Sequence, residues 1–100
     1  MKTMKQLLES TGEAIEEVTE HNFYDLERNA QYKCFHGSQS SLSLFQGWVD
    51  ADDDFTTEEG PEGVYLLFRD VKDGDEWTAY YHKGYYRVGS SADVLSVLEI

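Results

Sequence analysis

The stretch from Gly63 to Val88, GVYLLFRDVKDGDEWTAYYHKGYYRV, most narrowly limits what this chain can fold into. It is the longest segment rich in β-branched and aromatic residues, and it is divided by turn residues as antiparallel strands require. At residues 72–75 the sequence KDGD predicts a tight turn, because Gly74 can adopt a positive φ and Asp73 can accept a hydrogen bond from the nearby backbone. The sequence HKG at residues 82–84 predicts a second turn. The stretch therefore predicts a meander of three antiparallel strands.

The flanking segments predict further strands and three helices. Alternating apolar residues predict a strand from Ser41 to Val49, where Gly47 indicates a bulge or a close backbone approach. Apolar residues at helical spacing predict an amphipathic helix from about Thr3 to Glu20, with Gly12 as its weak point. A short helix from Phe23 to Ala30 is also expected, which would bury Phe23, Leu26 and Ala30, and Tyr32 to Phe35 looks extended. A last helix is expected from Ala92 to Glu99.

Together these elements predict a fold of the α+β class over a single domain, residues 1–100. It would have an N-terminal amphipathic helix, an antiparallel sheet of four to five strands and a short C-terminal helix. The helices are expected on one face of the sheet.

The charge balance limits which partners the chain can bind. Twenty acidic residues against eight basic ones give a formal net charge of −12. Direct binding to nucleic acid or to an anionic membrane requires lysine and arginine side chains. We therefore expect neither nucleic acid nor a membrane as a direct partner. A basic protein partner fits this charge. The N-terminus lacks the apolar core of a signal peptide and no apolar run reaches membrane-spanning length, so we expect a cytoplasmic protein.

Metal and catalytic motifs are incomplete. Asp50, Asp52 and Asp54 match the first ligands of a calcium loop, but Phe55 and Pro61 replace the glycine and the glutamate that the loop requires. The single cysteine, at position 34, excludes an internal disulfide, and with His36 it lacks the paired spacing of a zinc site. We therefore predict no metal, no cofactor and no catalytic residue, and expect a protein that is not an enzyme. A small enzyme remains the third-ranked alternative.

Two acidic clusters are the candidate binding surface. In the predicted N-terminal helix, glutamates spaced 4, 3 and 4 residues apart would form one stripe. Like charges at i,i+4 destabilise a helix by about 0.2–0.5 kcal/mol per pair, and mixed charges would give solubility without this cost. The second cluster lies in the acidic connection from residue 50 to 63. The predicted partner-binding residues are Glu9, Glu13, Glu16, Glu17, Glu20, Asp52, Asp53, Asp54, Glu58 and Glu59.

In size, charge and its two acidic clusters the chain resembles the DNA-mimic and anti-CRISPR proteins of phages and plasmids. The resemblance implies an inhibitor that occupies the basic, nucleic-acid-binding surface of a partner protein. Its carboxylates would replace phosphates, and exposed tyrosine or tryptophan side chains would add short-range contacts. The alternative is an immunity or chaperone-type antidote that binds one cationic toxin or effector.

Overall fold

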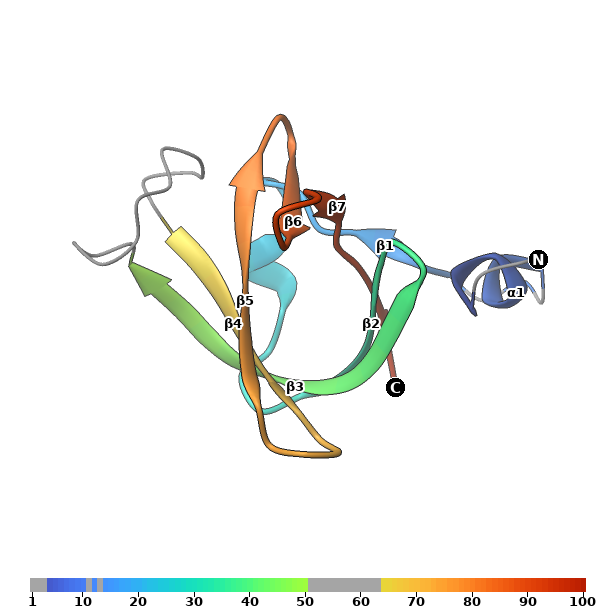
Figure 1. The fold of residues 1–100 in the computed structure, drawn as a ribbon, viewed down its shortest axis with the longest axis horizontal. Coiled ribbons are helices and arrows are strands. Elements are labelled where there is room, and N and C mark those ends of the chain that lie inside the picture. Colours follow the sequence, from blue (N-terminus) through green and yellow to red (C-terminus); the bar gives the residue numbers. More distant parts are fainter. Residues whose placement is uncertain (1–3, 11, 13, 51–63) are drawn as a thin grey trace.

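The structure, a computed structural model, describes residues 4–10, 12, 14–50 and 64–100 (Figure 1). Its main feature is one antiparallel sheet of eight strands in the order β1-β8-β2-β3-β4-β5-β6-β7. The elements are α1 (Met4–Ser10), β1 (Glu16–Glu17), the 3-10 helix η1 (Phe23–Asp25), β2 (Gln31–His36), β3 (Gln39–Asp50), β4 (Val64–Asp70), β5 (Glu76–His82), β6 (Tyr85–Val88), β7 (Asp93–Val94) and β8 (Ser96–Glu99). The predicted α+β class with four to five strands is therefore wrong.

The predicted N-terminal helix ends early. Helix α1 stops at Ser10, and Gly12 follows with φ +86°, a left-handed conformation that commonly ends helices. Beyond it the chain enters the sheet, where Val18 is almost fully buried and its backbone N–H donates to the carbonyl of Leu95 at 3.0 Å. Val18 is therefore buried beside the sheet and not on the apolar face of a helix.

The predicted C-terminal helix from Ala92 to Glu99 is also wrong. Ala92 has φ +57°, which a helix start does not allow, and the chain continues as β7 and β8. Strand β8 pairs with β2 from Tyr32 opposite Glu99 to Phe35 opposite Ser96. Leu95, between β7 and β8, and Val97 on β8 are both buried in the same hydrophobic core. A short apolar run fits the spacing of a helix and that of a strand equally well. Here the neighbouring strands supply the hydrogen-bond partners of the backbone.

The expected helix from Phe23 to Ala30 is reduced to the single turn of η1. Leu26 is already extended, with φ −74° and ψ 131°, and Asn29 has φ 65°. The predicted burial is nevertheless confirmed for Phe23 and Leu26, whereas Ala30 is only partly buried against the core. This segment fills the interior with two side chains while its backbone turns toward β2.

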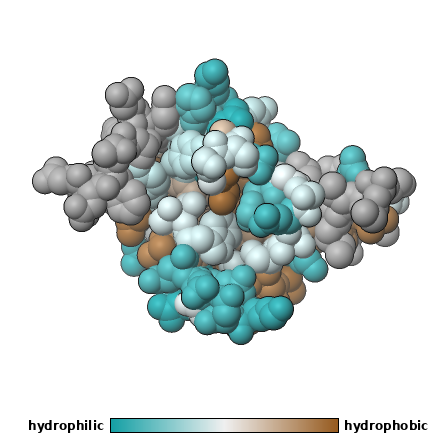
Figure 2. All heavy atoms as spheres, viewed as in Figure 1, coloured by the Kyte–Doolittle hydropathy of each residue, from teal (hydrophilic) through white to brown (hydrophobic). Residues whose placement is uncertain are grey.

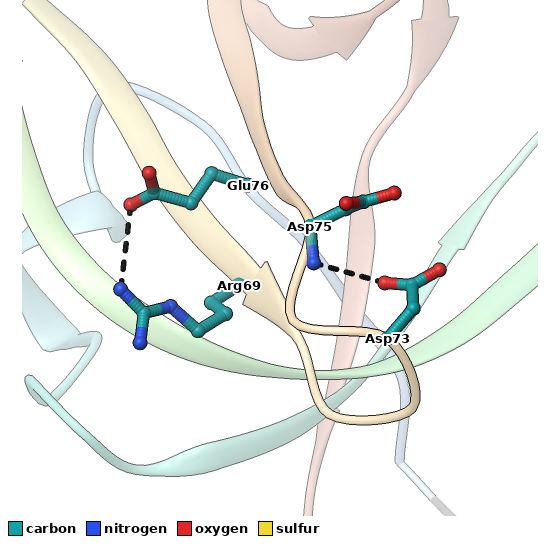
Figure 3. A network of polar contacts seen from close by, with 4 residues as sticks. All are labelled: Arg69, Asp73, Asp75 and Glu76. Carbon is teal, nitrogen blue, oxygen red and sulfur yellow. Dashed lines mark hydrogen bonds and ion pairs between the residues drawn. The ribbon is translucent and has the colours of Figure 1, made fainter.

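The predicted meander is confirmed in β4, β5 and β6. In the first turn Gly74 has φ +77°, and the backbone N–H of Asp75 donates to the Asp73 carboxylate at 2.9 Å (Figure 3). In β3 the register with β4 shifts between Phe45 and Gly47, which confirms the bulge. A Cβ at Gly47 would lie 3.0 Å from Nε of Arg28, so the close approach is also present.

The sheet curls until its two ends meet. Strand β6 pairs with β7, and the same chain continues as β8 to pair with β2 (Figure 1). At the junction three buried residues form a ring of backbone hydrogen bonds: Val18 donates to Leu95 at 3.0 Å, Leu95 to Tyr86 at 2.8 Å, and Tyr86 to Val18 at 2.8 Å. This ring holds the N-terminal segment, β6 and the β7–β8 chain together around the core.

Candidate functional site

The structure describes the side chains of only part of the predicted acidic surface. Glu16 and Glu17 are exposed on β1, and Glu20 is exposed in the turn that follows. The helical stripe is wrong for these residues, because adjacent strand residues point to opposite faces. For Glu9 only the backbone is described, in α1. The other predicted residues lie outside the described residues: Glu13, Asp52, Asp53, Asp54, Glu58 and Glu59. The partner-binding role of the whole set remains a prediction.

Glu16 borders a groove of about 490 Å³, which we call the acidic groove. The groove lies among β1, η1, the start of β2 and the end of β8. Its lining residues are Ala14, Glu16, Val18, Asn22, Asp25, Leu26, Tyr32, Val97, Leu98 and Glu99.

The short length of β1 leaves room for this groove. Strand β1 pairs with β8 only through Glu16 opposite Val97 and Glu17 opposite Ser96. Strand β8 runs on to Glu99, which pairs with Tyr32 of β2 on its other side. The acidic groove therefore lies beside the last residues of β8, where the paired length of β1 has ended.

The acidic groove has an apolar floor and an acidic rim. Val18, Leu26 and Val97 are buried residues of the core, each less than 8% exposed, and they form the floor. The side chains of Glu16, Asp25 and Glu99 are exposed and belong to three different elements or their ends. Among the described lining residues there is no lysine, arginine or histidine. The groove thus combines buried apolar surface with negative charge that no described lining residue neutralises.

Tyr32 reports on the electrostatics of the acidic groove. Its buried hydroxyl accepts a hydrogen bond from the backbone N–H of Glu27 at 2.9 Å. Burial raises the pKa of Tyr32, and the negative charges of Glu99 and Glu27 raise it further, against the opposing effect of that hydrogen bond. Burial disfavours a charge of either sign, so only the part of this pKa shift that comes from Glu99 and Glu27 reflects negative charge beside the groove.

The arginines of the described chain are engaged elsewhere. The guanidinium of Arg87 donates to the carbonyls of His82 at 2.6 Å and of Ala92 at 3.0 Å. Arg69 pairs with Glu76 at 3.8 Å beside the β4–β5 turn (Figure 3), where hydrophilic residues cover the lower end of the molecule (Figure 2). Arg28 lies over the ring of Trp48, 5.9 Å from its centroid. These cations therefore do not neutralise the acidic groove, whose lining they do not join.

Aromatic side chains that do not line the groove lie at η1 and on the sheet strands near it. Tyr24 is 72% exposed, and its ring centroid is 6.1 Å from that of Trp48. The hydroxyl of Tyr81 lies 3.5 Å from the carboxylate of Glu20. This group provides exposed aromatic surface next to a predicted acidic residue, as the sequence led us to expect of the tyrosines.

Sequence reasoning missed most of the acidic groove. Asp25 and Glu99 were both assigned to helices, and Tyr32 was noted only as extended. The alternation of Leu95 and Val97 was the one local signal for a strand at the C-terminus. Nothing in the sequence indicated that Glu16, Asp25 and Glu99 would border one cavity.

The metal candidates divide between described and undescribed residues. The acidic run that resembles a calcium loop lies almost wholly outside the described residues. Cys34 is buried, with its Sγ 3.9 Å from the carbonyl of Tyr32, and burial raises the pKa of its thiol. Among the described residues no group of three or more His, Cys, Asp or Glu side chains could hold a metal ion.

Comparison with known proteins gave no match to a protein-family model, to a curated protein or to a solved structure. In the described part of the chain no helix has the length and apolar character needed to cross a membrane.

Proposed function

We propose that this protein is a small acidic inhibitor, of the DNA-mimic and anti-CRISPR kind, that occupies a basic, nucleic-acid-binding surface on a partner protein. The observation that carries the proposal is the acidic groove, where Glu16, Asp25 and Glu99 surround an apolar floor without a basic lining residue. The net charge of −12 supports the same assignment. The protein acts by binding and not by catalysis.

Two contributions to binding act over different ranges. The net charge steers a cationic partner toward the protein, and this attraction is screened over about 8 Å at physiological ionic strength. The apolar floor contributes only on contact, and salt does not screen it. A partner held by both should associate more slowly as salt rises, while part of its affinity persists.

The test is a pull-down with the tagged protein from the host lysate at low and high salt, followed by purification of the captured partner. We expect a basic protein whose nucleic-acid binding is lost when the acidic protein is added. Competing DNA or RNA should release that partner. A single small toxin that stays bound at high salt and in excess nucleic acid would contradict the proposal and favour an antidote.

A charge-matched pair of variants makes this test specific. The double substitution Glu16→Lys and Glu99→Lys reverses the rim of the groove and should weaken capture at least tenfold. Asp75→Lys and Glu76→Lys make the same change in net charge at the β4–β5 turn, outside the groove, and should weaken it no more than threefold. Equal effects of both pairs would show that net charge alone governs binding.

A further inference from the structure

We infer that the acidic groove binds a short basic segment of polypeptide in which an apolar side chain is flanked by lysine or arginine. This inference rests on the proposed function and names the partner chemistry of the same site. The occupant is a segment of the partner protein, inserted beside the end of β8.

The first argument is the shape of the groove. Its volume of about 490 Å³ lies within the range of pockets that enclose small ligands, about 300–1,000 Å³. The floor residues Val18, Leu26 and Val97 are part of the buried core, so the floor is held in place before any partner arrives. A floor of this kind favours an inserted apolar side chain, which a surface recognised by charge alone would not require.

The second argument is the position of the charges. Glu16 lies on β1, Asp25 ends η1 and Glu99 ends β8, so the carboxylates border the floor from separate segments. Lysine and arginine side chains combine an apolar stem with a cationic head. Such a side chain can lay its stem on the floor and place its head at the rim, and an apolar neighbour can fill the remaining volume.

The charges also argue against two other occupants. Nucleic acid would bring phosphates to a rim that already carries three carboxylates. A second copy of this chain would bring another net charge of −12. A basic segment is the one occupant of the three that both the rim and the whole molecule attract.

The experiment titrates the ¹⁵N-labelled protein with three blocked peptides at low salt: Ac-RLRLR-NH₂, Ac-RSRSR-NH₂ and Ac-SLSLS-NH₂. Amide chemical shifts locate each peptide and give its dissociation constant. We expect RLRLR to bind at least tenfold more tightly than RSRSR, and SLSLS to bind too weakly to measure. The largest shifts should fall on Val97, Leu98 and Glu99.

Two variants with equal net charge complete the test. Glu16→Gln with Glu99→Gln should weaken RLRLR binding at least fivefold, whereas Asp75→Asn with Glu76→Gln should change it less than twofold. Equal binding of both cationic peptides, or shifts spread over the surface, would overturn the inference and leave charge-driven partner binding intact. Shifts at these residues that depend on protein concentration without peptide would also overturn it, because a second copy would then fill the groove.

Discussion

At the scale of single residues, Tyr86 carries a buried polar group in the described core. It is fully buried, and its hydroxyl has no hydrogen-bond partner among the residues that the structure describes. Its ring centroid lies 5.4 Å from that of Phe23 and 5.5 Å from that of Tyr81. A buried polar group without a partner loses its hydration and gains nothing in return, so this hydroxyl lowers stability. Burial also raises the pKa of Tyr86, with smaller contributions from Tyr24, Tyr81 and Glu20.

We therefore predict that Tyr86→Phe raises the free energy of unfolding by about 1 kcal/mol. Urea denaturation followed by tryptophan fluorescence measures this change. Tyr81→Phe is the matched control, because its hydroxyl lies near solvent beside Glu20, and it should change stability by less than about 0.5 kcal/mol. Destabilisation by Tyr86→Phe would mean that the hydroxyl has a stabilising partner.

The same substitution tests the pH dependence. In the folded state the pKa of Tyr86 is raised, so its hydroxyl keeps its proton at a pH above 10. In the unfolded state the hydroxyl has the ordinary pKa of about 10 and loses its proton near that pH. The unfolded state then binds fewer protons, so stability falls as the pH rises above about 10. The Tyr86→Phe variant should lose less stability than the wild type between about pH 9 and 11. Parallel pH profiles would show that Tyr86 does not contribute to the alkaline decline.

At the scale of elements, the junction of Val18, Leu95 and Tyr86 joins parts that are far apart in the chain. It ties the N-terminal segment to β6 and to the break between β7 and β8. Each of the three residues is buried, and each donates a backbone hydrogen bond to one of the other two and accepts one from the third. A displacement of one residue would therefore break hydrogen bonds to both others. Helix α1 projects away from this curled sheet (Figure 1), and its Leu7 is 46% exposed. The junction, and not the helix, carries the packing at this end of the chain.

We predict that Leu95→Ala lowers the free energy of unfolding by about 2–5 kcal/mol, the usual cost of truncating a fully buried leucine. Leu7→Ala, the same substitution on α1, should cost less than about 0.5 kcal/mol. Thermal or urea unfolding measures both. Similar losses from the two variants would show that α1 packs on the body as firmly as the junction does.

At the scale of the whole molecule, the excess of acidic residues opposes folding as well as favouring a basic partner. With a net charge of −12 on one hundred residues, the acidic side chains repel one another in the compact folded state, and salt screens this repulsion. The ion pair of Arg69 and Glu76 is half exposed on both sides and contributes little against it. Stability and partner affinity should therefore respond to salt in opposite directions.

We predict that the midpoint of thermal unfolding rises between about 10 mM and 0.3 M NaCl, while the affinity for the basic partner falls. Calorimetry at several salt concentrations measures the first quantity, and titration with the RLRLR peptide measures the second. The Asp75→Lys and Glu76→Lys variant carries less net charge and should show a smaller rise in the midpoint. A midpoint that falls with salt would show that favourable ion pairs outweigh the repulsion.

The sequence by itself determined the meander from β4 to β6 and the bulge at Gly47, because turn residues and alternation act between near neighbours. It also determined the net charge and the burial of Phe23 and Leu26. The tertiary structure decided that Val18 and Leu95 lie at the junction of the sheet and not in helices. Their short apolar runs fit either a helix or a strand, and their hydrogen-bond partners are distant in sequence. It alone placed Glu16, Asp25 and Glu99 around one cavity, because β8 comes from the far end of the chain and pairs with both β1 and β2.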